Sequence, residues 1–520
     1  MISRIKNLFV RENSVRGASL ILIVTLALSN LLGVLRDHFL ASHIPTDRLD
    51  IYFAAFRLPD LVFNVLILGS IAAAFVPVYS SYMKEKGQKE ATRLAQASIT
   101  IGVLAVIVCL ALLYLLMPFL MNYLVPSFDA QKKAETVYFA RWLLFSPLFF
   151  TVSYFLGGIL NAHKRFLAYS IAPLIYNISI IFGILLFSER FGVGGVIIGV
   201  ITGSILHLLV QLIPAYRTGF SLKFIFDLKE AGVRRILKLM VPRAIGLGTN
   251  QILLVAFTSF ASAFPGGIAI YNFADNMQTV PSVIFGSSFA LAVFPTLAGL
   301  SLKVAEDKER FLQLFYKSTR AILFFIVPST ALIIILRAQI IRIVLGYGFF
   351  GWSDTRAAAA TLGLFAISII AQGLIPLFAR SFYAVHDTRT PMYASIFSII
   401  LSVSLGYIFS RSAAPAAEGV SSLALAFSIG SWVNLFILAI LFNKKIRINY
   451  QYILNFLMGV VAMTAVMMII AQGVKVLVAD FYDIDMVRFL ALQILLTALI
   501  GGGSYLGLAY LFNFEEVRKQ

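Results

Sequence analysis

The chain has few charged residues and a single cysteine. Only 13% of its 520 residues are charged, 60% are hydrophobic, and the mean hydropathy is +0.90. A soluble domain carries about a quarter of charged residues, so we predict a polytopic membrane protein. Cys109 stands alone in an apolar run. No disulfide or metal site can therefore be built from cysteines, and a small core residue is the simplest interpretation.

The usual signatures of catalysis are also missing. The sequence has no Gly-Lys-Ser/Thr of a P-loop, no H-E-x-x-H and no G-x-S-x-G, and its five histidines have no metal-ligand spacing. Asp483 and Asp485 form a D-x-D pair, but the short loop around them favours a solvated surface over a glycosyltransferase site. Gly195, Gly199 and Gly203, four residues apart, predict close helix packing. We expect no enzyme activity, no cofactor and no bound metal.

Long apolar runs fill most of the chain, and no small-residue cleavage site follows the first one. An apolar segment of about 20 residues can cross a bilayer as a helix. The residues before the first run place Ile2, Ile5 and Phe9 on one helical face, which predicts either a helix on the membrane surface or a basic tail. Fourteen spans are predicted at residues 17–40, 49–82, 94–117, 135–160, 169–188, 194–216, 236–260, 269–301, 313–336, 356–384, 391–410, 418–442, 451–472 and 487–512.

The basic residues indicate the orientation in the membrane. The formal net charge is +18, and with the N-terminus inside, the cytoplasmic segments hold roughly three times as many lysines and arginines as the outer loops. Both termini should then be cytoplasmic. Such residues also attract anionic membrane lipids, so nucleic-acid binding is not expected.

Two parts of the sequence repeat at a distance of about 220 residues. LGSIAAAFVP at 68–77 returns as FGSSFALAVFP at 285–295, and NAHKRF at 161–166 corresponds in position to AVHDTR at 384–389. Six spans lie in each copy, so the copies share one orientation. We predict an N-terminal lobe at 1–234, a C-terminal lobe at 235–450, and two further helices at 451–520. Two-lobe membrane proteins of this kind usually transport a substrate between the lobes.

Charged side chains inside the spans are the main candidates for function, because they are costly in hydrocarbon. Arg36 in span 1, Arg57 and Asp60 in span 2, and Asp275 in span 8 all fall in the outer half of the membrane. Spans 2 and 8 are equivalent in the two repeats, so their charges are predicted to face each other. Arg243, in the inner half of span 7, is a weaker candidate.

Span 1 also carries a polar stripe. Ser29, Gly33, Arg36 and Asp37 follow the i, i+4, i+7, i+8 pattern of one helix face, as in the wall of a hydrated cavity. The alternative is that Arg36 and Arg57 extend to the outer interface and that Arg36 and Asp37 form a helix-end pair.

The same residues carry a resemblance to a known family. The segment Ser29-Asn-Leu-Leu-Gly33-Val-Leu-Arg36-Asp37 resembles the first span of the MurJ (MviN) family of lipid II flippases. Residues 50–59, the GS-x-x-x-A-F-V-P segment, the turn at 160–162, and residues 382–391 are similar to that family as well, so that the resemblance covers nearly the whole chain.

The resemblance implies an all-α fold of the multidrug/oligosaccharidyl-lipid/polysaccharide exporter superfamily. That fold has fourteen helices, two six-helix lobes related by a pseudo-twofold axis, a V-shaped cavity, and a lipid-facing groove in the last two helices. It also implies a bacterial inner-membrane protein, here expected as a monomer, that moves lipid II or a similar polyprenyl-diphosphate glycolipid to the outer leaflet.

Several positions depart from the family pattern. Asn30, Phe63, Asn64 and Asn276 stand where the family tends to have basic residues, and only Arg36 keeps its place. Either Arg57 and Arg243 supply the missing charge, or neutral donors such as Asn64 and Asn276 engage the head group. The predicted substrate-binding residues are Ser29, Arg36, Asp37, Arg57, Asp60, Asn64, Arg243, Asp275 and Asn276.

Three rival functions remain open at this stage. The nearest is a flippase of the same superfamily for another undecaprenyl-linked oligosaccharide, followed by a drug or cation antiporter, although a cationic cavity disfavours a cation cargo. A polytopic glycosyltransferase would need catalytic carboxylates in a sizeable outer loop. The longest outer loops supply only Asp129 and Asp354.

Overall fold

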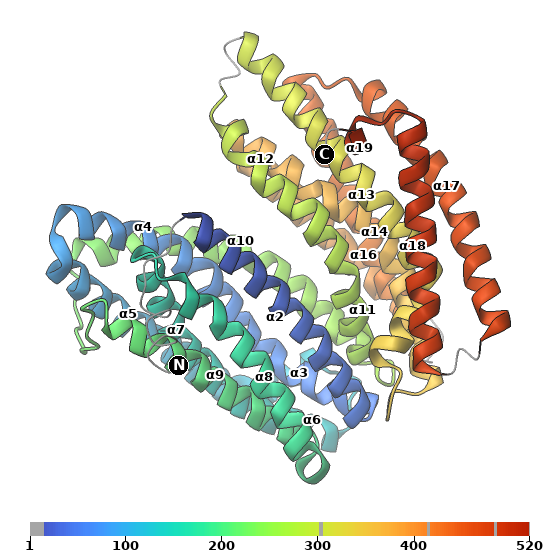
Figure 1. Cartoon of the computed structure of the whole chain (residues 1–520). Helices are drawn as coiled ribbons and strands as arrows, with labels where there is room; N and C mark the ends of the chain where they lie inside the picture. Colours follow the sequence, from blue (N-terminus) through green and yellow to red (C-terminus); the bar gives the residue numbers. More distant parts are fainter. Residues whose placement is uncertain (1–14, 301–304, 413–416, 483–485, 519–520) are drawn as a thin grey trace, which may run out of the picture. The chain divides into compact units, whose positions relative to one another are not determined.

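The computed structural model describes residues 15–300, 305–412, 417–482 and 486–518, and over these residues the regular structure is entirely helical. The chain forms two compact units (Figure 1). Unit 1 is Met1–Ile268 with Tyr347–Phe349, and unit 2 is Ala269–Gly346 with Phe350–Gln520. The predicted surface helix or basic tail at the N-terminus lies outside the described residues.

Unit 1 is built mainly from long helices, and most of its helix pairs are separated in sequence. Helix α8 packs against both α2 and α9, and α7 packs against α4, α5 and α9. Its elements are α2 (Val15–His43), α3 (Thr46–Val62), the π-helix η1 (Phe63–Leu68), α4 (Gly69–Glu85), α5 (Gly87–Leu124), α6 (Ala130–Leu143), α7 (Phe145–Ala162), α8 (Phe166–Phe191), α9 (Val193–Tyr216) and α10 (Ala231–Ala261).

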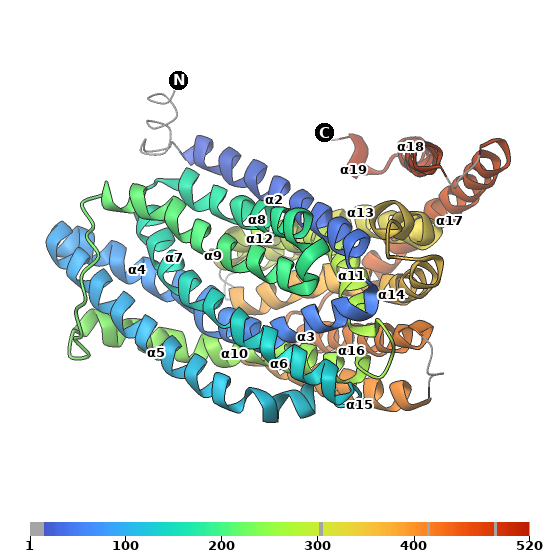
Figure 2. The same cartoon turned by 90° about the horizontal axis from the view of Figure 1, so that it is seen from below.

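Unit 2 has a core of α13, α14 and α16, with α17 and α18 paired with each other and packed on α13 (Figure 2). Its elements are α11 (Gly267–Pro281), the π-helix η2 (Ser282–Ser287), α12 (Ser288–Ala298), α13 (Ala305–Leu345), α14 (Trp352–Ala384), α15 (Arg389–Ser412), the 3₁₀ turn η3 (Ala417–Val420), α16 (Ser421–Ile446), α17 (Tyr450–Phe481), α18 (Val487–Leu511) and α19 (Glu515–Arg518).

The prediction of an all-α membrane fold is confirmed. Every predicted span falls on a helix or on two or three consecutive helical segments, and among the described residues eleven helices are long and apolar enough to cross a membrane. The predicted spans at 17–40, 49–82 and 236–260 are not among these eleven. The total of fourteen spans therefore stays a prediction.

The boundary of the compact units differs from the boundary drawn between the repeats. Helix α10, which the sequence repeat assigns to the second copy, packs against α3, α4 and α5 within unit 1. A repeat boundary records sequence similarity, whereas a compact unit records contacts, so the two need not coincide. The division at residues 234 and 450 stays a prediction.

The repeated LGSIAAAFVP and FGSSFALAVFP segments share an unusual backbone. In each copy a π-helix of six residues follows a proline in the preceding helix: η1 follows Pro59, and η2 follows Pro281. Proline removes a hydrogen bond of the α-helical ladder, and π-helical segments within helices often lie at functional sites. Both copies therefore interrupt the corresponding helix in the same way.

The second repeated pair ends a helix with the same turn in both copies. After α7, the amide of Arg165 donates to the carbonyl of Leu160, and after α14 the amide of Asp387 donates to that of Phe382. Between them Lys164 and His386 have φ values of 55° and 60°, the left-handed conformation of a Schellman motif. The backbone conformation of this turn is therefore more similar between the two copies than the amino-acid sequence is.

Asp387 also joins this turn to two helices of unit 2. Its carboxylate accepts hydrogen bonds from the amide and hydroxyl of Thr390, at 3.0 and 2.9 Å, and from Lys445 Nζ at 2.8 Å. Burial alone would raise the pKa of this carboxyl group, but the bonds from Lys445 and Thr390 lower the pKa to about 2. The loop between α14 and α15 is therefore fixed by an ionised group at neutral pH.

Glycines allow α8 and α9 to approach closely, as their spacing predicted. The chain turns between these helices at Gly192, whose φ is 54°. A Cβ atom on Gly195 would lie 2.5 Å from the backbone carbonyl carbon of Phe187, and one on Gly199 would lie 2.9 Å from Cα of Gly183. The backbones are in contact there, so side chains cannot be added without separating the helices.

We expect Gly195→Ala to lower the thermal stability of the purified protein, because the added methyl group meets backbone atoms of α8. Overpacking of this kind costs about 1–3 kcal/mol. The neighbouring Gly194→Ala is the control, since its Cβ would lie at an ordinary 3.5 Å from Phe139 Cε1. Melting curves in detergent should separate the two variants, and equal midpoints would contradict the close-packing interpretation.

Candidate functional site

The polar stripe predicted on span 1 is anchored by an ion pair. Arg36 Nη2 and Nε lie 2.9 and 3.2 Å from Asp37 Oδ1. The Asp37 side chain is only 3% exposed and that of Arg36 is 23% exposed, so a buried carboxylate holds a partly accessible guanidinium group. The sequence pattern predicts this pair, and both a binding role and a structural role are compatible with it.

Asn177, which has no counterpart among the residues predicted from the sequence, completes this arrangement. Asn177, on α8, accepts a hydrogen bond from Arg36 Nη1 at 3.3 Å and lies 3.4 Å from both the carbonyl and hydroxyl oxygens of Ser29, to which it donates. One amide thus bridges two predicted site residues that are two turns apart on α2. The packing of α2 on α8 places Asn177 there.

The Arg36 guanidinium group keeps donors for a further partner. A guanidinium group has five N–H donors in a planar fork, and the contacts to Asp37 and Asn177 engage three of its nitrogens. The hydroxyl groups of Tyr52 and Tyr176 lie within electrostatic range of Arg36. An anion that reached Arg36 would therefore meet unused N–H groups beside neutral hydroxyl groups, which suits a phosphate oxygen.

Arg57 and Asp60 lie on α3 in the same unit. Arg57 is 8% exposed, and its Nε donates to the hydroxyl of Thr258 on α10 at 2.8 Å. The Asp60 carboxylate interacts electrostatically with Arg57 and, more weakly, with Arg36. The structure thus joins the charges of spans 1 and 2 in one cluster, with two arginines balanced by Asp37 and Asp60.

The remaining predicted residues are placed less centrally. Asn64 lies in η1 and donates to the backbone carbonyl of Asp60 at 2.9 Å. In unit 2, Asp275 accepts a hydrogen bond from Gln278 at 2.9 Å and Asn276 is exposed. Arg243 lies within α10, but its side chain is outside the described part of the structure. The predicted approach of span 2 and span 8 charges stays a prediction.

A cavity of about 270 Å³ lies beside the Arg36 stripe within unit 1. Ser29 lines it together with aromatic and amide side chains of α7, α8 and α9, among them Tyr154, Tyr169 and Gln211. His207 accepts or donates a 2.7 Å hydrogen bond with Ser153, and Gln211 donates to the same hydroxyl. Of the stripe, Ser29 lines this partly open cavity, so the wider hydrated wall stays a prediction.

Most of the chain matches a known protein family. The family model described as lipid II flippase MurJ matches residues 46–492. The chain belongs to this family. It is also similar to a probable lipid II flippase MurJ of Rickettsia prowazekii, with 27% identity over 500 residues that cover 95% of this chain and 97% of the relative.

Solved structures agree with the fold. The structure resembles a lipid II flippase MurJ in an inward closed conformation, with 24% identity, a TM-score of 0.78, and coverage of 95% of this chain and 98% of the other. It also resembles an inward-facing multidrug resistance MATE family transporter of the MOP superfamily, at 15% identity and a TM-score of 0.63, covering 82% of this chain and 98% of the other. The superfamily fold inferred from the sequence is thus confirmed.

The sequence alone did not indicate two partners in the arginine cluster, Asn177 and Thr258. Asn177 is the one amide in the predicted span 169–188, and Thr258 is one of two hydroxyl residues near the outer end of span 7. A lone polar residue in an apolar run is a signal for a buried hydrogen bond. The sequence does not say with which helix that bond is made.

We expect Thr258→Val to destabilise the fold of unit 1, because it removes the acceptor of the buried Arg57 Nε. Leaving such a donor unpaired costs about 1–3 kcal/mol. Thr258→Ser keeps the hydroxyl group and is the matched control. Thermal unfolding of the two purified variants measures the difference, and a Thr258→Val midpoint equal to that of Thr258→Ser would show that this hydrogen bond contributes little.

Proposed function

We propose that this chain is a flippase that moves lipid II, the lipid-linked peptidoglycan precursor, from the inner to the outer leaflet of the bacterial inner membrane by alternating access. The observation that carries the proposal is the match to the lipid II flippase family over residues 46–492. The accessible donors of Arg36, set among buried partners, supply a chemical reason for it.

The physical task is to carry a polar, anionic head group past hydrocarbon. Arg36 binds the diphosphate through the N–H groups that Asp37 and Asn177 leave unused, while Asp37 holds the guanidinium group in place. Arg57 is fixed by Thr258 and acts at longer range through its charge. Asp37 and Asp60 balance the charges of the two arginines. Without substrate, the cluster therefore leaves no unpaired charge inside the membrane.

The polyprenyl tail stays in lipid beside α17 and α18. These helices present large apolar side chains to their surroundings, and Ile469, Phe481, Leu499 and Leu511 are each more than 60% exposed. Extended apolar surface of this kind is typical of a face that contacts lipid or another apolar partner. The sequence contains no nucleotide-binding motif, so the drive comes from the membrane potential, an ion gradient, or removal of the product at the outer side.

A second candidate, a flippase for another undecaprenyl-linked oligosaccharide, is favoured by one observation. Asn64, which stands where the family tends to have a basic residue, uses its amide on the carbonyl of Asp60 in the preceding turn. A head group of lower charge would need fewer cations at this position. Both candidates share the diphosphate, and therefore the role of Arg36.

Growth of a peptidoglycan-making host depleted of its own flippase tests the proposal. We expect the wild-type chain to restore growth, Arg36→Lys to restore it partly, and Arg36→Ala to fail while insertion remains normal. Hydrogen bonds to charged groups contribute about 1.5–3 kcal/mol, which corresponds to at least a tenfold loss of rate. Lysine keeps the charge but not the planar fork.

The double variant Arg36→Ala, Asp37→Ala is the control for a structural role. It leaves no stranded buried carboxylate, so it should recover stability relative to Arg36→Ala and still fail to support growth. Full growth of the double variant would show that Arg36 does not bind the substrate. Failure of the wild-type chain, with confirmed insertion, would favour the second candidate function.

The orientation is proposed with both termini in the cytoplasm. In a Cys109→Ala background, we expect cysteines at the exposed positions Lys89 and Lys229 to be shielded from an impermeant thiol reagent in intact cells. A cysteine at the exposed Ala263 should be labelled. Permeabilised cells, in which all three positions should react, provide the control, and a reversed pattern would overturn the orientation.

A further inference from the structure

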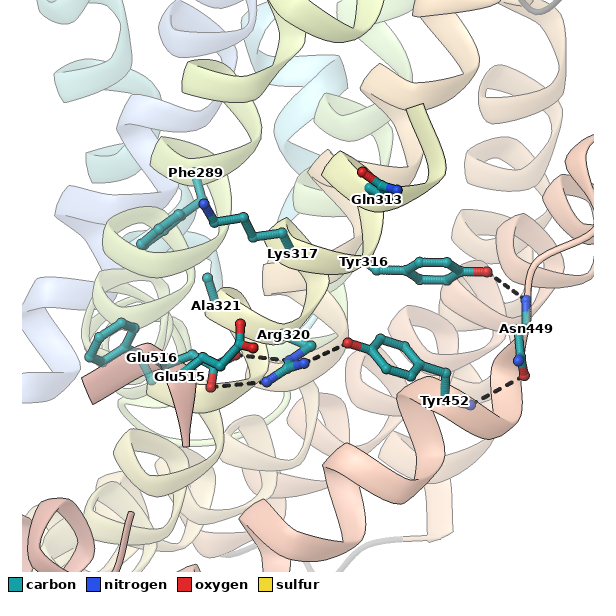
Figure 3. A pocket seen from close by; sticks show the side chains of 11 residues that line it. Phe289, Gln313, Tyr316, Lys317, Arg320, Ala321, Asn449, Tyr452, Glu515 and Glu516 are labelled. Atoms are coloured by element: carbon teal, nitrogen blue, oxygen red, sulfur yellow. Dashed lines mark hydrogen bonds and ion pairs between the residues drawn. The ribbon is translucent and has the colours of Figure 1, made fainter. Parts of the chain in front are cut away.

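Unit 2 contains a cavity that none of the predicted site residues lines. Its volume is about 600 Å³, and α12, α13, α17 and α19 contribute its walls (Figure 3). Small-molecule sites are typically about 300–1,000 Å³. The cavity is therefore large enough for the head group of an amphiphile, and its lining shows what kind of head group fits.

The lining combines apolar, cationic and anionic side chains. Phe289 and Phe325 provide aromatic surface, while Lys317 and Arg320, one turn apart on α13, provide two positive charges. Arg320 is followed by an uncharged stretch, residues 321–336, that ends at Arg337. At 1.5 Å per residue this stretch spans about 24 Å, close to the thickness of a hydrocarbon core. The length of this stretch is consistent with a position of the two cations near one membrane interface.

Arg320 already holds an anion that belongs to the chain itself. Its Nε and Nη2 donate to the two carboxylate oxygens of Glu516 on α19, at 2.9 and 3.3 Å, and its Nη1 donates to the hydroxyl of Tyr452 at 2.5 Å (Figure 3). The guanidinium group also lies over the ring of Phe456, 4.5 Å from its centroid. A phosphate group can bind an arginine side chain in the same bidentate geometry as this carboxylate.

Lys317 is different. Its side chain is exposed to the cavity, and in the described part of the chain it makes neither a hydrogen bond nor an ion pair. The lining therefore contains one arginine whose charge is balanced by Glu516, and one lysine without an acidic partner among the described residues. The carboxylates of Glu515 and Glu516, which also line the cavity, would repel a doubly charged diphosphate. A phosphodiester carries a single negative charge, which Lys317 can balance.

We propose that this cavity binds the phosphodiester head group of an anionic phospholipid, with the phosphate on Lys317 and the first part of an acyl chain against Phe289 and Phe325. Glu516 competes with the lipid for Arg320. The site is separate from the proposed transport cluster in unit 1, and its test needs no transport measurement.

Native mass spectrometry of the full chain, released from bilayers of phosphatidylglycerol and phosphatidylcholine, tests the site. We expect the wild-type chain to retain phosphatidylglycerol preferentially and Lys317→Gln to retain it about fivefold less well, since one lysine near an anionic lipid surface contributes about 1 kcal/mol. Arg310→Gln is the control. Arg310 lies on the same helix, does not line the cavity, and forms an exposed ion pair with Glu306.

Glu516→Gln should have the opposite effect. It removes the internal competitor for Arg320, so retention of phosphatidylglycerol should rise above that of the wild type, whereas a merely structural role for Glu516 predicts no gain. Equal losses in Lys317→Gln and Arg310→Gln would overturn the proposal. Displacement of the lipid by equimolar glycerol phosphate, or by a polyprenyl phosphate, would also overturn it, because the ligand would then be a soluble phosphate or the carrier lipid.

Discussion

The rest of the structure depends on how an arginine is kept inside an apolar helix. Charge in hydrocarbon is stable only with partners, and Arg36 has two: the adjacent Asp37, which is nearly fully buried, and the amide of Asn177 on α8. The first partner is fixed by sequence adjacency and the second requires that α2 pack on α8. Helix packing and the chemistry of the stripe are therefore one constraint, and neither can change without the other.

The same constraint explains the neutral character of the cluster. Arg57 lies almost completely inside unit 1, with Thr258 as acceptor and Asp60 within electrostatic range. Two arginines and two aspartates leave little net charge, so the folded cluster avoids the penalty of isolated buried ions. In the function proposed above, binding depends on the hydrogen-bond donors of Arg36 that remain available, and less on an excess of positive charge. We therefore expect a cavity in which positive and negative charges are balanced and the N–H groups of Arg36 provide the hydrogen-bond donors, instead of a strongly cationic cavity.

Much of the fold could be predicted because the bilayer imposes a length and a composition on each span. Close packing of α8 and α9 was also predictable, since Gly195 and Gly199 recur on one helix face. The π-helices after Pro59 and Pro281 were not, because an i→i+5 bond leaves no residue pattern of its own. Asn177 and Thr258 escaped prediction for another reason: a partner on a distant helix is chosen by tertiary packing, which no local pattern records.

Four of the described cations differ in how many of their hydrogen-bond donors are used within the chain. Arg57 is buried beside its acceptor on α10, and Arg320 is held by both oxygens of Glu516 and by Tyr452, so each of them joins helices. Arg36 keeps part of its fork free while remaining accessible, and Lys317 faces a cavity with no anion among the described residues. Since a donor in or near hydrocarbon gains most from an anion, Arg36 and Lys317 are the two of these four cations at which we propose a ligand.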